Sequence, residues 1–209
     1  MKMRTKGICN IIFDLGGVLI DIDPERCTNR FEEIGMRGAA AFLKSEAFVR
    51  VWLQFERGEM DAAEFRTFIR THNEELLDAS NEDIDYAWNG MLVGIPRYKL
   101  DLLLDLRSRY VVYLLSNTNS IHWEWALENP FRYKGFQADD FFEQEYLSFR
   151  LQACKPEKAI FERVLQDANL EPNETLFIDD RPENTKAAQA LGLKTYTPQP
   201  NENWSFLFD

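Results

Sequence analysis

The sequence predicts an α/β fold, a doubly wound parallel (Rossmann-like) sheet with a small α-helical cap subdomain inserted after the first strand. Short β-rich apolar runs alternate with helical stretches along the chain, which is typical of a parallel sheet with helices on both faces. After the first run come about seventy residues of amphipathic helical pattern without a convincing strand, whereas a crossover needs only about a dozen. We therefore expect a core of residues 1–23 and 95–209 and a helical cap of residues 24–94.

The predicted strands are short apolar runs rich in β-branched and aromatic residues, and they cover residues 8–13, 110–116, 175–178 and 194–197. Helices are predicted beside the later strands, over residues 96–109, 155–170 and 181–192. Each has a proline at its start, where the missing N–H needs no partner. Residues 201–209 are apolar for a chain end, and we expect them to pack on their own domain.

The composition favours a small-molecule partner. The net charge is -11 and no basic stripe is present, which disfavours nucleic acid and anionic membranes as partners. No stretch approaches the roughly twenty apolar residues of a membrane-spanning helix. An anionic small molecule would need positive charge from a metal ion or a lysine against this acidic background. Nothing in the sequence indicates the oligomeric state.

The cysteines and histidines point away from disulfides and from histidine-based metal chemistry. Cys9, Cys27 and Cys154 are odd in number, widely separated and without a CxxC pair, so a reducing, cytoplasmic location fits best. His72 and His122 form no metal-binding pattern. We expect each of the two histidines to be a surface side chain or a buried one with its hydrogen bonds satisfied.

Polar side chains stand where the predicted strands end, and ligands of an open parallel sheet bind outside these carboxyl ends. The residues are Asp14 after the first strand, Ser116 and Asn117 after the second, and Asp179 and Asp180 after the third, with Lys155 ahead of the third. A carboxylate directly after an apolar strand is costly unless a cation or hydrogen-bond donors meet it. Two adjacent acids also repel each other unless a cation lies nearby.

Taken singly, these residues also have structural interpretations. Ser116 or Asn117 could cap the next helix, as could Thr118 or Asn119. Lys155 could be a solvated side chain, and the acidic pair could cap the helix that follows it. Taken together, a carboxylate nucleophile, hydroxyl and amide donors, a lysine and an acidic pair for a metal are the groups needed to transfer a phosphoryl group through an aspartyl-phosphate.

The order and placement of these groups resemble the haloacid dehalogenase-like superfamily. The first motif is matched by "FDLGGVL" (13–19), the second by "LLSN" (114–117), the third by the lysine of "CKPEKAIF" (154–161) and the fourth by "FIDDRPEN" (177–184). The helical insertion looks like the cap of the superfamily's phosphatase branch. With "FERGEM" (55–60), the chain is also similar to the bacterial α-D-glucose-1-phosphate phosphatase group.

The resemblance implies a role for each matched residue. Asp14 would attack phosphorus, Ser116 would hydrogen-bond the transferring phosphoryl group, and Asn117 would lie close to the substrate. Lys155 would neutralise the nucleophile and the phosphoryl oxygens. Arg57 of the cap would reach the substrate, unless it belongs to a solvated turn.

Mg²⁺ is the cofactor that the resemblance implies. Asp14, the backbone carbonyl of Gly16 and Asp180 would hold the ion, with Asp179 bound to it directly or through water. Magnesium prefers oxygen ligands and keeps several waters, which suits such a sparse set of protein groups.

Gly16 departs from the superfamily pattern. Most of these phosphatases carry a second aspartate two residues after the nucleophile, as general acid and then base. Such help is worth roughly 10²–10⁴ in rate. The loss of this acid either cripples the enzyme or restricts it to good leaving groups, such as the anomeric hydroxyl of a sugar 1-phosphate, unless another acid replaces the aspartate. Asp21, Asp23 and Glu56 are the first candidates for that acid.

The sequence thus predicts a Mg²⁺-dependent phosphatase of small sugar phosphates, such as glucose 1-phosphate. A non-catalytic protein that binds a phosphorylated ligand is the alternative, although a binder needs no nucleophile. A 2-haloacid dehalogenase is a third hypothesis. Because dehalogenation needs no metal, the Asp179–Asp180 pair argues against it.

Overall fold

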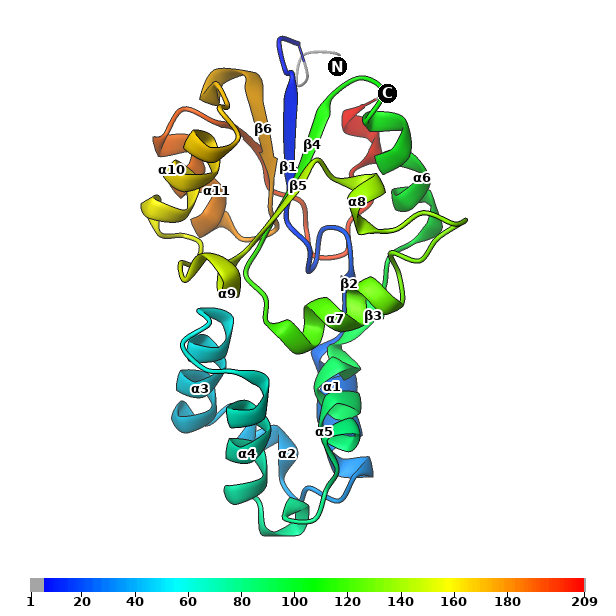
Figure 1. Cartoon of the computed structure of the whole chain (residues 1–209), viewed down its shortest axis with the longest axis vertical. Coiled ribbons are helices and arrows are strands. Elements are labelled where there is room, and N and C mark those ends of the chain that lie inside the picture. Colours follow the sequence, from blue (N-terminus) through cyan, green and yellow to red (C-terminus); the bar gives the residue numbers. More distant parts are fainter. Residues whose placement is uncertain (1–5, 209) are drawn as a thin grey trace.

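The core is a five-stranded parallel sheet in a computed structural model that describes residues 6–208 (Figure 1). The strand order is β5-β4-β1-β6-β7. The bounds are β1 (Asn10–Phe13), β4 (Val111–Ser116), β5 (Gln144–Leu147), β6 (Thr175–Ile178) and β7 (Lys194–Tyr196). The four predicted strands are confirmed. The edge strand β5 was not predicted because its sequence, QEYL, has only two apolar residues.

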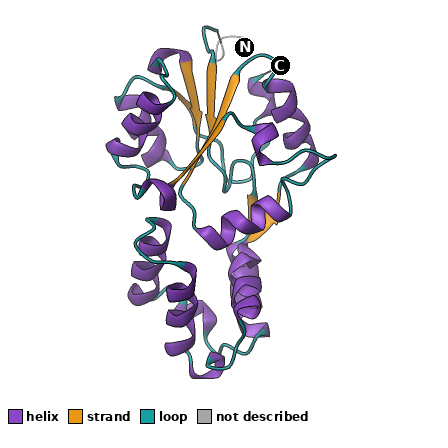
Figure 2. Ribbon diagram, in the orientation of Figure 1, coloured by secondary structure: helices purple, strands orange, loops and turns teal. Residues whose placement is uncertain are grey.

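Helices cover both faces of this sheet, as Figure 2 shows. The helices of the core are α6 (Arg97–Leu106), α7 (Ser120–Glu128), α8 (Ala138–Phe141), α9 (Ser148–Leu151), α10 (Lys158–Asp167) and α11 (Pro182–Ala190), with the short 3-10 helices η3 (Pro172–Glu174) and η4 (Ser205–Leu207). Side chains alternate along β1, so that Ile11 and Phe13 pack in one apolar cluster with α6 and α8, and Ile12 in another with α10. The predicted α/β class, with a parallel sheet between two helical layers, is confirmed.

Two details of the core differ from the sequence prediction or extend it. Helix α10 begins at Lys158 and not at Lys155, because Glu157 has extended backbone angles and takes the N-cap position. The predicted packing of the chain end is confirmed, since Trp204 is fully buried in the core and its Nε1 donates to the Val18 carbonyl over 2.9 Å. This bond ties the end of the chain to the loop that follows β1.

The inserted stretch folds mainly as helices, which lie at the far end of the molecule from the two termini (Figure 1). Its elements are α1 (Pro24–Glu33), α2 (Ala39–Phe42), α3 (Glu46–Glu56), α4 (Ala62–Thr71), η1 (Glu74–Leu76), α5 (Asn81–Trp88) and η2 (Asn89–Met91). They share an apolar cluster of their own, with Phe48, Phe65 and Trp88 at its centre. We therefore keep the predicted division into a core and a cap as our interpretation.

The expectation that this stretch contains no strand is wrong in one place. Strand β3 (Leu92–Gly94) pairs antiparallel with β2 (Asp21–Ile22), and this ribbon joins the cap to the core. Each strand is too short to show a period-2 pattern, so only tertiary pairing reveals them. Among residues 6–208, no helix combines the length and hydropathy that crossing a bilayer requires.

Candidate active site

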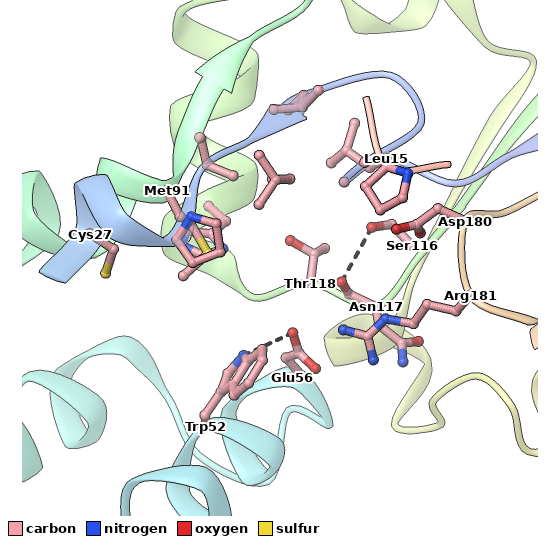
Figure 3. Close-up of a pocket in the computed structure, with 18 of the residues that line it drawn as sticks. Leu15, Cys27, Trp52, Glu56, Met91, Ser116, Asn117, Thr118, Asp180 and Arg181 are labelled. Carbon is pink, nitrogen blue, oxygen red and sulfur yellow. Dashed lines mark hydrogen bonds between the residues drawn. The ribbon is translucent and has the colours of Figure 1, made fainter. Parts of the chain in front are cut away.

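The parallel sheet brings the predicted polar residues to one edge. Asp14 follows β1, Ser116 ends β4 and Asp180 follows β6, and β1 pairs in parallel register with both neighbours. All three line a cavity of about 500 Å³ between this edge and the cap (Figure 3). Lys155, from the segment before α10, lines the same cavity. The structure therefore brings together residues that are far apart in the chain.

The buried ammonium group of Lys155 forms ion pairs with two of the acidic side chains. Its Nζ lies 2.8 Å from Asp14 Oδ1 and 2.7 Å from Asp179 Oδ2, and it donates to the Leu115 carbonyl over 2.8 Å. Burial by itself lowers the pKa of Lys155, but the two carboxylates outweigh it and raise that pKa above its usual value. The lysine therefore stays charged beside Asp14.

Asp179 and Asp180 have different surroundings. Both oxygens of the fully buried Asp179 accept hydrogen bonds, from Lys155 Nζ, the Arg181 backbone N–H and the Asn184 side-chain amide. Asp180 is only half-buried and lines the cavity. Sequence reasoning assigned no role to Asn184, although a polar residue on the buried side of α11 is a signal for one.

The two carboxylate oxygens of Asp14, the predicted nucleophile, differ in their partners. Its Oδ1 accepts a hydrogen bond from the Leu15 backbone N–H over 2.7 Å and pairs with Lys155. Its Oδ2 accepts no hydrogen bond from the part of the chain that the structure describes. Burial raises the pKa of the Asp14 carboxyl to about 7, with Lys155 opposing this shift and Asp179 adding to it. A cation bound beside this group would favour its ionised form.

The residues present fit a divalent cation. Oxygens of Asp14, Asp179 and Asp180 all lie within 4.8 Å of one another. With Lys155 as their ammonium partner, the three ionised carboxylates leave a net charge of -2 (three negative charges and one positive), which a Mg²⁺ ion would cancel. Gly16, whose carbonyl is the predicted fourth ligand, also lines the cavity. Oxygen donors of this kind are those that magnesium prefers.

Ser116 and Asn117 are not helix caps. Asn119 caps α7, where its side chain accepts from the His122 backbone N–H. The side-chain amide of Asn117 makes two hydrogen bonds with the backbone of Lys155. Its Oδ1 accepts from the Lys155 N–H over 2.8 Å, and its Nδ2 donates to the Lys155 carbonyl over 2.9 Å. Asn117 thus positions the lysine, and its contact with substrate stays a prediction. Ser116 is buried on the cavity wall, as its predicted role requires.

Arg57 lies outside the residues that line the cavity. Its guanidinium forms an ion pair with Glu157, the N-cap residue of α10. This pair links the cap to the core. The structure therefore offers no support for the predicted contact between Arg57 and the substrate.

The remaining wall of the cavity is largely apolar and aromatic. The apolar residues that line it include Ile20, Ile22, Leu43, Phe48, Trp52, Trp88, Met91 and Leu92. Most come from the cap and from the ribbon that joins it to the core. The cavity therefore has a polar end at the sheet and an apolar end toward the cap.

Gly17 lets the chain pass close to Asp180. Its φ of +74° lies in the left-handed region, and a Cβ on it would lie 2.6 Å from Asp180 Oδ2. We expect Gly17→Ala to displace this carboxylate, so that phosphate release falls by at least about tenfold and more Mg²⁺ is needed for half-maximal rate.

The matched control for this prediction is Gly38→Ala. Gly38 has a similar φ of +68°, but no atom lies within 4 Å of its added Cβ. Both variants pay the strain of about 1 kcal/mol for a left-handed alanine. Equal magnesium dependence of the two variants would show that the contact with Asp180 is irrelevant.

One histidine lies at the surface and the other is buried with its ring nitrogens partnered, as predicted. His72 is exposed, and His122 is buried with Nε2 3.2 Å from the Trp88 carbonyl and Nδ1 3.2 Å from the Asn119 amide. Burial lowers the pKa of His122 to about 4. The ordinary value is about 6.5, so between these two pH values the unfolded chain binds a proton that the folded chain does not.

We therefore expect His122 to make the fold less stable as the pH falls below about 6.5. Lowering the pH from about 7.5 to about 5 should cost about 2 kcal/mol through this residue alone. Urea unfolding of the wild type and of His122→Gln at both pH values measures it, and the loss should be smaller in the variant. Equal losses would contradict the prediction.

The fold and the site define a hydrolase whose acidic cluster lies at the carboxyl ends of a parallel sheet. The chain belongs to the haloacid dehalogenase-like hydrolase family, whose model matches residues 10–192. It is 34% identical to the D-ribitol-5-phosphate phosphatase of Bacteroides thetaiotaomicron, over 94% of this chain and 95% of that one. It is 26% identical to the sesquiterpene phosphatase astK of Aspergillus oryzae, over 87% of this chain and 85% of that one.

Solved structures agree with this assignment. The haloacid dehalogenase family enzyme BT-2542 of Bacteroides thetaiotaomicron superposes with a TM-score of 0.94 at 49% identity, over 97% of this chain and 99% of that one. The same enzyme in complex with magnesium and inorganic phosphate gives a TM-score of 0.89, over 97% and 100%. An L-2-haloacid dehalogenase of Xanthobacter autotrophicus, at 17% identity, shares the fold, with a TM-score of 0.62 over 91% and 77%. The predicted phosphatase class and the choice of Mg²⁺ are confirmed.

Proposed function

We propose that this protein hydrolyses small phosphate monoesters of sugars or sugar alcohols through an aspartyl-phosphate on Asp14. The observation that carries the proposal is the convergence of Asp14, Lys155 and Asp180 at the polar end of one cavity. A non-catalytic binder has no need of a carboxylate oxygen left free beside a charged lysine. A dehalogenase has no need of the acidic cluster.

The site residues divide the work of the reaction. Oδ2 of Asp14 attacks phosphorus while Lys155 neutralises charge on the nucleophile and on the phosphoryl oxygens. The bond from phosphorus to the leaving alcohol breaks, and water then hydrolyses the aspartyl-phosphate. When bound by Asp14 and Asp180, Mg²⁺ supplies the positive charge that offsets the phosphate dianion.

The substrate class rests on the relatives and on the size of the cavity. The relative at 34% identity is named for ribitol 5-phosphate, and a cavity of about 500 Å³ has room for a ligand of that size. Glucose 1-phosphate, expected from the sequence, stays a candidate. The apolar cap end of the cavity favours a second candidate, the phosphate monoester of an apolar alcohol.

A phosphate-release assay tests the proposal. The panel contains ribitol 5-phosphate, glucose 1-phosphate, glucose 6-phosphate and geranyl phosphate, each with Mg²⁺ and with EDTA, and 2-chloropropionate assayed for chloride. We expect Mg²⁺-dependent release from at least one polyol phosphate. Release only from geranyl phosphate would select the second candidate, and full activity in EDTA or chloride release would contradict the mechanism.

We propose the cytoplasm as the location and a small phosphate ester as the partner, with no nucleic acid and no membrane as a partner. The acidic net charge of -11 supports the absence of nucleic acid and membrane partners.

A further inference from the structure

The site has no general acid next to the nucleophile. Gly16 occupies the position of the usual second aspartate, although a Cβ there would meet nothing closer than Ile22 at 3.5 Å. Asp21 already has another partner, because its Oδ1 accepts a hydrogen bond from Lys99 Nζ over 3.0 Å. Asp23 caps α1 by accepting from the Glu25 backbone N–H. Neither aspartate lines the cavity.

Glu56, the last residue of α3, does line the cavity. Figure 3 shows its side chain extending from the cap toward the side of the cavity where Asn117 and Arg181 lie. The charges of Arg181 and Lys155 are close enough to lower the pKa of its carboxyl. The carboxyl of Glu56 therefore faces the region between the phosphoryl site and the cap, where the leaving alcohol must lie.

Five other titratable groups on the cavity wall are less suited to donate a proton to that alcohol. Asp14 and Asp180 belong to the acidic cluster, and Lys155 is held by two carboxylates. Both ring nitrogens of His122 have partners, and burial raises the pKa of the Cys27 thiol to about 12. Glu56 is thus the one carboxyl on this wall, within the described residues, that lies outside the acidic cluster.

Contacts on both sides hold Glu56 in place. Trp52, one turn earlier in α3, donates from Nε1 to Glu56 Oε1 over 2.9 Å. The hydroxyl of Ser148 lies 2.6 Å from the Glu56 carbonyl oxygen and accepts from the Thr118 backbone N–H. Two residues on, a Cβ on Gly58 would lie 2.1 Å from the Phe149 carbonyl oxygen, so the cap meets the core closely here. Such support is what a catalytic group needs.

We propose that Glu56 is the general acid that replaces the aspartate absent at Gly16, an inference that rests on the proposed function. As the bond between phosphorus and the ester oxygen breaks, the protonated carboxyl of Glu56 gives its proton to that oxygen and becomes a carboxylate. It then takes a proton from the water that attacks the aspartyl-phosphate. Free phosphate leaves, and both Asp14 and Glu56 return to their starting forms.

The surroundings of Glu56 raise the pKa of its carboxyl above the usual value. Burial raises its pKa, while the Trp52 hydrogen bond and the charges of Arg181 and Lys155 oppose the shift. From the core, the thiol of Cys154 also lies near Glu56, with its Sγ 3.8 Å from the Glu56 carbonyl oxygen. A raised carboxyl pKa is what a general acid requires near neutral pH.

The test compares two leaving groups in Glu56→Gln, which keeps the size and the acceptor for Trp52 but cannot transfer a proton. The substrates are p-nitrophenyl phosphate, whose leaving group needs no proton, and the best alkyl phosphate from the panel above. We expect kcat/KM for the alkyl phosphate to fall by roughly 10²–10⁴ and that for p-nitrophenyl phosphate by less than about tenfold. The exposed neighbour Glu59, changed to Gln, is the matched control and should leave both values unchanged.

An equal fall for both substrates, or a rise in KM alone, would show that Glu56 binds substrate and would overturn the inference. If the wild type hydrolyses neither substrate, the proposed function itself fails. If Glu56→Gln does not fold, Trp52→Phe gives the same answer, because it removes a hydrogen bond that favours the carboxylate. The alkaline limb of the pH–rate profile for the alkyl phosphate should then move to higher pH in this variant. If that limb moves no further for the alkyl phosphate than for p-nitrophenyl phosphate, the result would contradict the inference.

Discussion

Asp14→Asn should abolish phosphate release, with kcat/KM falling by at least about 10⁴, since the amide cannot form the aspartyl-phosphate. The loss should be the same for p-nitrophenyl phosphate, which separates it from the effect at Glu56. Initial rates measured with saturating Mg²⁺ check this. Residual turnover above about one hundredth of the wild-type value would rule out Asp14 as the nucleophile.

The same variant should be more stable than the wild type in EDTA. The pKa of Asp14 is raised from about 3.8 to about 7 in the folded chain, so between these values the folded chain binds a proton that the unfolded chain does not. Stability is therefore lost as the pH rises through that range, and the neutral amide of the variant does not share the loss. We expect a gain on the order of a few kcal/mol at about pH 8, seen as a higher urea midpoint. A lower midpoint would contradict the electrostatic account.

Lys155→Met should have the second large effect, on folding as well as on activity. The substitution leaves Asp14 and Asp179 buried without the ammonium that lies 2.8 and 2.7 Å from them. Removing one partner of a buried ion pair costs roughly 3–5 kcal/mol. Urea unfolding in EDTA should show this loss, and phosphate release should be undetectable.

Lys158→Met is the matched control for that loss. Lys158 lies three residues further on and forms an exposed ion pair with Glu162, one helical turn away. Such surface pairs contribute about 0.3–0.5 kcal/mol, so this variant should unfold close to the wild type and keep its activity. Similar losses in the two lysine variants would mean that the buried cluster does not depend on Lys155.

Much of the site could be predicted from the sequence, because its residues follow apolar strands. Asp14, Ser116 and Asp180 come directly after or at the end of the runs that form β1, β4 and β6. Parallel strands that pair in register must bring these ends to one edge, so the order of the motifs along the chain was enough to predict the cluster. Other local signals, namely prolines at helix starts and short apolar runs, placed most of the core elements.

Elements with a weak local pattern could not be predicted. Strand β5 has two apolar residues and lies at the sheet edge, and β2 and β3 have two and three residues each. Their backbone groups are satisfied by pairing with segments distant in the chain. Nothing in a short window of sequence encodes that pairing.

The sequence by itself determined the family of this protein and the positions of Asp14 and the acidic pair at the strand ends. Only the tertiary structure decided between candidates that look alike in a sequence. Asp21, Asp23 and Glu56 are three carboxyls of similar chemistry, and two of them bind Lys99 and the start of α1. Glu56 reaches the cavity because the cap folds back over the sheet edge, with the Ser148 hydroxyl 2.6 Å from its carbonyl oxygen. Which side chain faces a cavity depends on how separate elements pack, and that packing joins residues too far apart in the chain for any local pattern to relate them.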